Sequence, residues 1–297
     1  MTHEPGARKG RLVVCGATGY LGGHVARAAH DAGWRVRALA RDPARLAPVR
    51  DAVDEVFEGH ATDPASVAGL FDGADAAFSS IGVRHFGRSP TIWDVDRDAN
   101  LHLLEEAARA GVGRFAFVSV FRGPELRDRL AVAEAREAVV DALRSAVATP
   151  IVVRPNGFFD DMAEIFAMAA RGRVWTIGSG RTRFNPIHGA DLAEVVVEAI
   201  DAGEPAAIDV GGPEVLTMRE VGALAFDALG RPARYGRVPV GLVRALAAAA
   251  RPFSPNAATF LRMFAVLGAE DVVAPARGHR RLAAEMRRLA TRAAIDR

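Results

Sequence analysis

The sequence predicts an α/β fold with a doubly wound parallel sheet and a smaller C-terminal α+β lobe. In the first half of the chain, short apolar runs alternate with amphipathic stretches of helical spacing. Such alternation needs crossover connections, which are right-handed and produce parallel strands. A glycine-rich turn joins the first apolar run to the first amphipathic stretch. The alternation loosens after Pro155 without a long Gly/Ser linker, which indicates a second region rather than a tethered module.

The first half of the chain reads as strands separated by helices. Leu12–Cys15 is a short apolar run, as expected of a strand buried on both faces. Helical spacing predicts a helix over Tyr20–Ala32, which Gly33 ends. Another helix is expected to start at Pro43. The strands expected next are Trp34–Ala40, Val53–Glu58, Asp75–Ile81, Arg114–Val120 and Ile151–Arg154. The helices expected between them are Pro64–Phe71, Thr91–Ala110 and Leu130–Ser145.

The second half predicts a smaller lobe. Its expected helices are Phe158–Ala170, Ala190–Asp201 and Met218–Leu229, followed from Val240 by helices broken at Pro252 and Pro255. Its expected strands are Val174–Ile177, Phe184–Ile187, Ala207–Val210 and Arg234–Val238. We therefore divide the chain into a core over residues 11–157 and a lobe over 158–297 that packs on it. Residues 184–210 are expected to return to the main sheet.

The composition excludes several classes of protein. Of the 297 residues, 50% are hydrophobic and 25% charged, which is typical of a globular chain and not of a disordered one. No stretch of 18 residues lacks a charge, so we expect no membrane span. The N-terminus has no apolar segment of the kind a secretory signal needs. The single cysteine, Cys15, excludes an internal disulfide and a cysteine-based zinc site, and it fits a reducing cytoplasm.

The charge pattern does not indicate a nucleic-acid partner. The formal net charge is only +2, and the 38 basic residues are all arginine except Lys9. This arginine and alanine bias is typical of a GC-rich genome, so we expect no nucleic acid. No His, Asp and Glu cluster has the spacing of a metal site such as HExxH, so we expect no metal.

A GxxGxxG motif follows the first predicted strand and opens the first predicted helix. Gly16 permits the tight turn, Gly19 lets a pyrophosphate approach the backbone, and Gly22 lets the helix pack close to the strand. The N-terminus of the helix then faces the phosphates. In this context the motif predicts a dinucleotide site.

The end of the second strand predicts which dinucleotide binds. A site specific for NAD presents a carboxylate there to the ribose 2′-OH, whereas this chain has Ala40 followed by Arg41, which can pair with a 2′-phosphate. We therefore expect NADP(H) to be preferred over NAD(H). Asp42 is the alternative: it either serves as the ribose acid one position late or caps the helix that starts at Pro43.

Several segments together resemble a known family. GATGYLG, VRALARDPARL, RFAFVSV, IVVRPNGFF and NPIHGADLAEVVVEAI look like an atypical short-chain dehydrogenase/reductase, closest to its NmrA-like, NAD(P)-binding branch. The resemblance covers roughly residues 11–235, with the motifs in family order. It implies a Rossmann-type dinucleotide-binding domain with a small C-terminal α+β substrate lobe.

The resemblance also implies roles for matching residues. The pyrophosphate would contact the glycine turn, through Gly16, Thr18, Gly19, Tyr20, Leu21 and Gly22. Arg41 would bind the 2′-phosphate, and Asp63 would lie near the adenine. The ribose would be lined by Ser79, Ser80, Ile81 and Gly82. The nicotinamide would be flanked by Ser119, Pro155, Asn156 and Gly157.

One departure from the family is informative. The superfamily's standard acid is a Tyr-x-x-x-Lys pair on the helix after strand five, and alignment of that helix places Val132 and Arg136 there. No shift of alignment restores the pair, because the only tyrosines are Tyr20 and Tyr235 and the only lysine is Lys9. Arg136 can still bind the ribose, but it cannot tune a tyrosine that is absent.

Two residues are candidates for catalysis. Ser119 ends strand five, where the superfamily polarises a carbonyl; its alternative role is to cap the strand end. His188 titrates near neutral pH and is a candidate general acid, whereas the alternative is that His188 and Asn185 fix a loop and Asp191 caps the next helix. Asn156 either contacts the carboxamide or substrate, or fixes a loop.

The sequence therefore favours an NADPH-dependent oxidoreductase that lacks the Tyr/Lys pair and reduces a quinone-like or conjugated small molecule. The alternative is a non-catalytic NAD(P)-binding sensor or assembly factor. Either protein would be cytoplasmic, and monomer and homodimer both remain open.

Overall fold

This computed structural model describes residues 9–295 and contains a seven-stranded sheet flanked by helices. The segment in which we looked for a secretory signal lies largely outside these residues. Within them, no helix is both long enough and apolar enough to cross a membrane.

The main sheet has the strand order β3-β2-β1-β4-β5-β6-β9. Its pairs from β3 to β6 are parallel; Cys15, for example, lies between Leu39 and Ser79. The strand bounds are β1 (Arg11–Cys15), β2 (Arg35–Ala40), β3 (Glu55–Glu58), β4 (Ala76–Ser79), β5 (Arg114–Val118), β6 (Thr149–Pro155) and β9 (Ala206–Val210). The order reverses between β1 and β4, the topological switch point where such sheets bind ligands.

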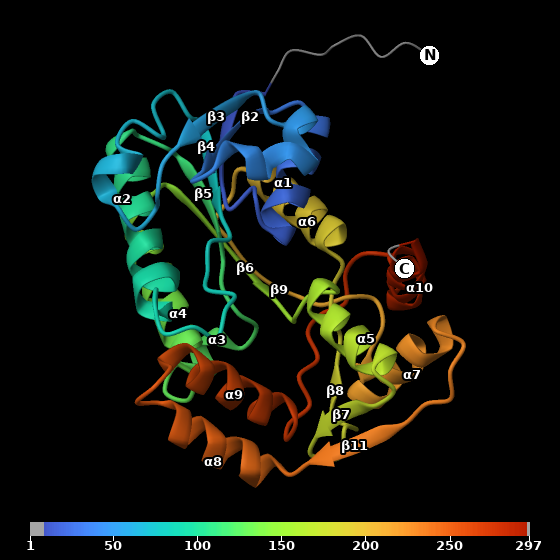
Figure 1. Ribbon diagram of the computed structural model, residues 1–297. Coiled ribbons are helices and arrows are strands. Elements are labelled where there is room, and N and C mark those ends of the chain that lie inside the picture. Colours follow the sequence, from blue (N-terminus) through green and yellow to red (C-terminus); the bar gives the residue numbers. More distant parts are fainter. Residues whose placement is uncertain (1–8, 296–297) are drawn as a thin grey trace, which may run out of the picture. The chain divides into compact units, whose positions relative to one another are not determined.

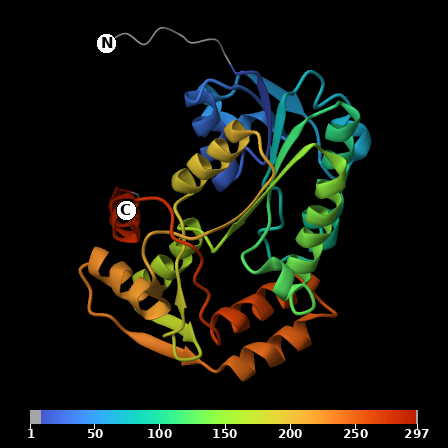
Figure 2. The ribbon, with the colours of Figure 1, turned by 180° about the vertical axis from the view of Figure 1, so that it is seen from behind.

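Helices cover both faces of this sheet, which confirms the doubly wound α/β fold (Figures 1 and 2). On one face lie α1 (Tyr20–Asp31) and α6 (Gly189–Ala202), and on the other lie α2 (Asn100–Arg109) and α4 (Ala131–Ala146). The short α3 spans Gly123–Leu126. Apolar side chains of α2 and α4 form one buried core with the strands, including Leu103, Leu143, Phe115 and Phe117.

Two predicted helices differ from expectation. The helix expected over Pro64–Phe71 is a 3-10 helix, η2, of only four residues (Pro64–Val67), and Gly69 just beyond it has a φ of +77°, a conformation that favours glycine. The helix that starts at Pro43 is likewise a 3-10 helix, η1 (Pro43–Ala52).

The long helix expected over Thr91–Ala110 begins as a π-helix, η3 (Trp93–Ala99), and continues as α2. A change from π to α geometry disrupts the regular backbone ladder. The side chain of Asn100 compensates, because its Nδ2 donates to the carbonyl oxygens of Val95 and Asp96 at 3.0 and 3.1 Å.

The chain forms two compact units. Unit 1 comprises the described residues up to Arg84, Pro90–Arg154 and Leu192–Ile208; unit 2 comprises His85–Ser89, Pro155–Asp191 and the described residues from Asp209. Of the segment 184–210, β9 joins the main sheet. The strand expected at Phe184–Ile187 is shorter, as β8 (Arg183–Phe184), and pairs instead with β10 (Leu216–Thr217).

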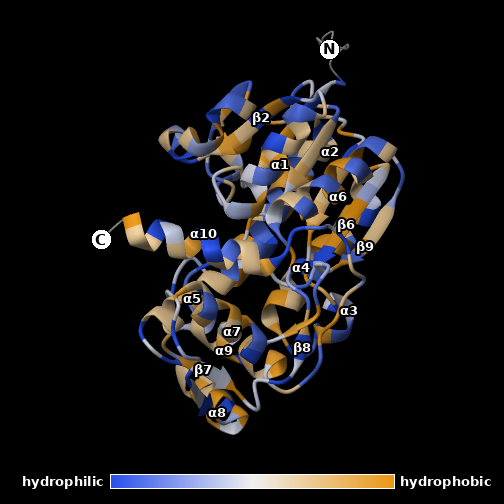
Figure 3. Ribbon diagram, turned by 90° about the vertical axis from the view of Figure 1, so that its right-hand side faces the viewer, coloured by the Kyte–Doolittle hydropathy of each residue, from blue (hydrophilic) through white to orange (hydrophobic). Residues whose placement is uncertain are grey.

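Unit 2 is built on small sheets and helices. Strands β7 (Val174–Ile177) and β11 (Tyr235–Val238) pair in parallel. Its helices are η4 (Asp160–Met162), α5 (Ala163–Ala170), α7 (Met218–Ala228), α8 (Val240–Ala250), α9 (Pro255–Leu267) and α10 (Leu282–Ile295). Hydrophilic and hydrophobic residues alternate along α10 (Figure 3), which buries Leu282 and Met286 in a core with Phe166 and Phe226.

Candidate functional site

The glycine turn after β1 has the geometry that the motif predicts. Gly16 has a φ of +103°, and its carbonyl oxygen accepts a hydrogen bond of 2.9 Å from the Gly19 amide. A Cβ on Gly22 would lie 2.1 Å from that same oxygen, so the close approach of α1 to the turn requires glycine.

The space beside Gly19 is largely free of other atoms, whereas the space beside Gly22 is filled by the backbone of the turn. A Cβ on Gly19 would meet only the Gly16 oxygen, at 3.2 Å, and Gly19 is exposed. Within the described residues, no side chain caps the N-terminus of α1, so this end offers backbone amides and a positive dipole to an anion. Leu21 is buried, so only its backbone is suited to that role. The turn therefore fits a pyrophosphate.

The loop after β4 lies against this turn. A Cβ on Gly16 would lie 2.9 Å from Ser80 Oγ, so the structure brings the two segments at the switch point together. The buried Ser79 hydroxyl donates to Asn100 Oδ1 at 2.6 Å, and Asn100 Nδ2 donates to the Ile81 oxygen at 3.2 Å. The side chain of Ser79 thus fixes this loop, leaving Ser80 nearest the glycine turn.

A pocket of about 280 Å³ opens beside the glycine turn. Thr18, Gly19 and Tyr20 line one side, and Arg45 lines another from η1. His24 also lines the pocket, with its ring edge-on to Tyr20 at a centroid distance of 5.1 Å. The motif reading missed Arg45 and His24. The signal for Arg45 was its place shortly after Arg41, at the start of the helix expected from Pro43.

The acidic residues near the cofactor positions act as helix caps. Asp42 accepts from the Ala44 amide at 3.0 Å and so caps η1, which is the alternative to ribose binding. Asp63 accepts from the Ala65 amide at 3.1 Å and caps η2. Arg41 directly follows β2 and is exposed.

Arg136 makes an internal network at the standard lysine position. Its guanidinium contacts the buried Asp96 carboxylate at 2.7 Å and donates to the carbonyl oxygens of Val118 and Ile81. A Cβ on Gly82 would lie 2.1 Å from Arg136 Nη2 and 2.8 Å from Asp96 Oδ1, so a side chain here would have to displace this ion pair. The donors that would meet a ribose are thus engaged at the ends of β4 and β5.

Ser119 belongs to a second buried network. Its hydroxyl donates to Glu137 Oε1 at 2.6 Å, and Arg154 holds the same carboxylate through two hydrogen bonds of 2.9 and 2.8 Å. All three side chains are buried. Because a serine has a single proton, this arrangement leaves the Ser119 oxygen as an acceptor for further partners. Glu137, the next residue after Arg136, was not foreseen.

His188 caps the N-terminus of α6. Its Nδ1 accepts from the Ala190 amide at 3.0 Å, and its ring lies edge-on to Phe159. Burial, reinforced by the charge of Arg280, lowers the pKa of His188 below its ordinary value, which favours the neutral ring. This matches the structural alternative for His188 better than the role of a general acid.

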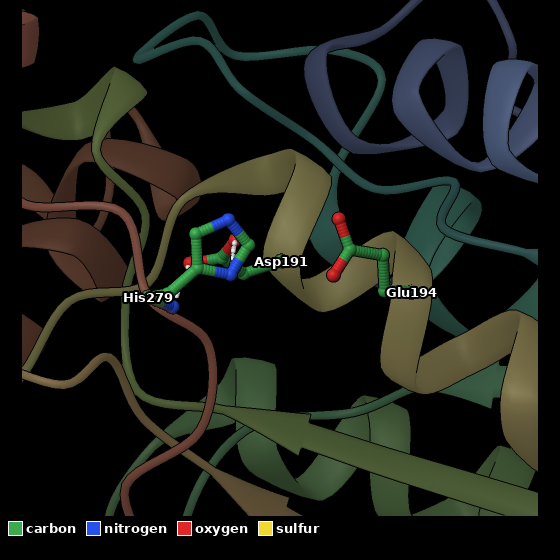
Figure 4. Close-up of side chains that lie close together, drawn as sticks. All are labelled: Asp191, Glu194 and His279. Carbon is green, nitrogen blue, oxygen red and sulfur yellow. Dashed lines mark hydrogen bonds and ion pairs between the residues drawn. The ribbon is translucent and has the colours of Figure 1, made fainter.

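The expectation that Asp191 caps this helix was wrong. Its buried carboxylate instead accepts from the backbone amides of His279 and Arg280 at 3.0 Å each and pairs with the Arg280 guanidinium. Burial alone would raise the pKa of Asp191, but these bonds outweigh it and lower the pKa. Figure 4 shows His279 against Asp191, with Glu194 on the next turn of α6. Because Arg280 already neutralises Asp191, we assign no cation to this group.

Asn156 and Asn185 fix loops in unit 2. Asn156 Nδ2 donates to Asn185 Oδ1 at 2.7 Å and to the Val272 oxygen. Asn185 in turn bonds both backbone groups of Ala274. Both asparagines are buried, which agrees with the loop-fixing alternative. Pro155 ends β6, and Gly157 has a φ of +79°.

Comparison with known proteins agrees with this geometry. The family model described as NAD(P)H-binding matches residues 16–203, which include the glycine turn, the β4 loop and both buried networks. Among curated proteins, the chain is 30% identical over 257 residues to divinyl chlorophyllide a 8-vinyl-reductase of Zea mays, covering 79% of this chain and 63% of that protein. It is 33% identical over 197 residues to ceramide reductase of Caulobacter vibrioides, covering 64% of this chain and 60% of that protein.

A solved structure shares the fold. The NADPH-dependent quinone oxidoreductase of Escherichia coli, complexed with NADPH, superposes with a TM-score of 0.66 at 16% identity, covering 94% of this chain and 99% of that one. The chain spans only about three fifths of the length of the curated relatives above. With its glycine turn, its sheet order and the family model that it matches, the chain belongs to the NAD(P)H-binding family, in the atypical short-chain dehydrogenase/reductase, NmrA-like group.

Proposed function

We propose that the protein is an NADPH-dependent reductase that works without the Tyr-x-x-x-Lys pair and reduces quinone-like or conjugated small molecules. The observation that carries this proposal is the open glycine turn at the switch point, combined with Arg136 at the lysine position engaged by Asp96. The first feature supports a nicotinamide cofactor, and the second supports chemistry without the standard acid. When bound, this cofactor supplies hydride.

The preference for NADPH rests on two arginines. Arg41 is exposed at the end of β2, and Arg45 lines the pocket beside the glycine turn. No carboxylate competes at Ala40, and Asp42 is engaged as a cap. An arginine that directly follows β2 and another that lines the pocket suit the doubly charged 2′-phosphate, because arginine binds phosphate in a bidentate manner.

The class of molecule that accepts the hydride depends on whether the protein can donate a proton to it. Reduction of an isolated ketone leaves an alkoxide, which needs a proton at once, and general acid catalysis there contributes about 10²–10⁴-fold. Ser119 directs its proton to Glu137, and His188 is biased toward its neutral form. A quinone or a conjugated enone leaves a delocalised anion, which is a weaker base, so water can protonate it. The names of the vinyl-reductase and quinone-oxidoreductase relatives agree with this choice.

A comparison of matched acceptors tests this proposal. NADPH oxidation should be measured with quinones, enones and the corresponding saturated ketones, and kcat/KM should be higher for conjugated acceptors by at least tenfold. Efficient reduction of a saturated ketone would contradict the proposal and would require an acid, with His188 as the first candidate.

A second candidate function is a cofactor-binding sensor or assembly factor. The observation that favours it is that the polar groups of both buried networks, around Arg136 and Glu137, are satisfied within the protein. Tight NADPH binding with no oxidation across the whole acceptor panel would support this second function.

A further inference from the structure

The α8–α9 corner of unit 2 exposes large apolar side chains. In the described part of the chain, nine large hydrophobic residues are exposed, and four of them belong to this corner. Leu242 and Leu246 lie on α8 with exposed fractions of 50% and 48%, and Phe253, in the turn after α8, is 75% exposed. We call these three residues, together with Phe86, the α8 face.

The apolar residues of α8 lie on two faces of the helix. Val243 and Ala247 are buried, and α8 runs beside α9 (Figure 1). Leu242 and Leu246 are spaced by four residues and so share a second side of the helix, and Phe253 is exposed in the turn that follows α8. A helix that packs against one neighbour needs only one apolar side. The second apolar side of α8 stays exposed, so packing within the protein does not account for it.

Phe86 is fastened to the same corner. The Ser254 hydroxyl donates to the Phe86 oxygen at 2.6 Å, and the Phe86 ring lies 5.2 Å from that of Phe260 on α9. Because Ser254 follows Phe253 directly, the loop carrying Phe86 is held next to the end of α8. Phe86 itself is 56% exposed.

The chain around the α8 face carries only positive charge. Between Asp227 and Glu270 there is no acidic residue, whereas this stretch contains six arginines: Arg231, Arg234, Arg237, Arg244, Arg251 and Arg262. Arg244 is exposed near the middle of α8, and Arg251 is exposed directly after its last residue. In a chain whose net charge is only +2, this separation of charge is pronounced.

Apolar Leu and Phe side chains combined with arginines and no acids suit the interface of an anionic bilayer. A second copy of the chain fits less well, because a two-fold interface would place two acid-free, arginine-rich segments against each other. We propose that the α8 face binds the surface of a bilayer that contains anionic phospholipids, with its apolar side chains among the acyl chains and its arginines near the headgroups.

Sedimentation with vesicles tests this proposal on the full chain. The protein should bind vesicles of phosphatidylcholine that contain roughly 30% anionic phosphatidylglycerol. It should bind pure phosphatidylcholine vesicles at least tenfold more weakly. Raising the salt from about 50 to 500 mM should weaken the binding, because surface charges are then screened.

Two sets of substitutions separate the apolar and basic contributions. Leu246→Gln with Phe253→Gln should lower the partition coefficient at least tenfold. Arg244→Gln with Arg251→Gln should lower it about fivefold for each arginine and flatten its salt dependence. The matched controls are Val215→Gln, an exposed apolar residue elsewhere in unit 2, and Arg171→Gln, an exposed arginine after α5; both should bind as the parent does.

All variants are expected to keep the parent's circular dichroism spectrum and melting temperature, because the substituted side chains are exposed. Equal binding to both kinds of vesicle, or equal losses in the controls, would overturn the proposal. So would elution of the parent as a dimer that Phe253→Gln converts to a monomer, since a second copy would then cover this face.

Discussion

The hydroxyl of Ser119 donates to the carboxylate of Glu137 at 2.6 Å, deep in the core at the end of β5. The residue that directly follows β5 is therefore a serine whose hydroxyl proton already has an acceptor within the protein. The same carboxylate is held by Arg154, so the serine is positioned by a buried ion pair on α4 and β6. This relationship leads to two predictions about Ser119 and Glu137.

Ser119→Ala should reduce kcat/KM with a quinone acceptor by less than tenfold. A serine that protonates the substrate would contribute about 10²–10⁴-fold, whereas a serine that donates to Glu137 contributes only through local order. Stopped-flow measurement of NADPH oxidation under single-turnover conditions isolates the chemical step. A loss beyond a hundredfold would show that Ser119 gives its proton to the acceptor.

Glu137→Gln should destabilise the protein by about 3–5 kcal/mol, because Arg154 would keep its buried charge without a compensating carboxylate. Urea unfolding followed by circular dichroism measures this change. Glu134→Gln is the matched control: Glu134 is exposed on the same helix, and its substitution should change the free energy of unfolding by no more than about 0.5 kcal/mol. Similar values for the two variants would contradict the buried network.

Gly19→Val should abolish NADPH binding while the fold persists. The valine side chain would occupy the space where a pyrophosphate approaches, yet its Cβ would meet only the Gly16 oxygen at 3.2 Å. Titration calorimetry measures the binding. Gly113→Val is the control, since a Cβ there has nothing within 4 Å. Retained binding in the Gly19 variant would remove the glycine turn from the site.

Arg41→Ala and Arg45→Ala should each lower the affinity for NADPH roughly tenfold or more, the effect of a lost charge-assisted hydrogen bond of about 1.5–3 kcal/mol. NADH binding should change little, because NADH lacks the 2′-phosphate. Arg35→Ala, at the opposite end of β2, serves as the control. Equal affinities of the unmodified protein for NADPH and NADH would contradict a role of these two arginines in binding the 2′-phosphate. Asp42 would then be the candidate that binds the ribose.

The stability of the protein should fall as the pH drops from 7 to 5, in part through His188. Its folded-state pKa lies below the ordinary 6.5, so the unfolded chain takes up a proton first and acid favours unfolding in that window. Replacing His188 with Asn, which can still cap α6, should flatten the pH profile by less than about 1.4 kcal/mol per pH unit, the limit for one proton.

The sequence predicted the sheet and the glycine turn well because both depend on local signals. Apolar runs such as Leu12–Cys15 have one stable placement, between two layers of helices, and the φ of Gly16 follows from the tight turn. The helix spacing could not reveal the π-helix at Trp93–Ala99, since a seven-residue segment is too short to separate one helical period from another.

The errors at polar residues have a different cause. A local rule made Asp191 a helix cap, but Arg280, 89 residues away, offers its carboxylate a guanidinium and a backbone amide. In the same way, Glu137 looks like a surface residue in the sequence and is buried only because Arg154 reaches it from β6. Pairings over such distances leave no periodic signal.

The close fit of Gly82 against Arg136 bears on protein engineering. The substitutions Val132→Tyr and Arg136→Lys would introduce the standard motif into α4. The ammonium group of a lysine, however, cannot replace the planar guanidinium of Arg136, which bonds Asp96 and two backbone carbonyls at the same time. Asp96, buried within the π-helix, would lose part of its compensation. A design that restores ketone reduction in this scaffold must therefore rebuild positions 82 and 96 along with the helix itself.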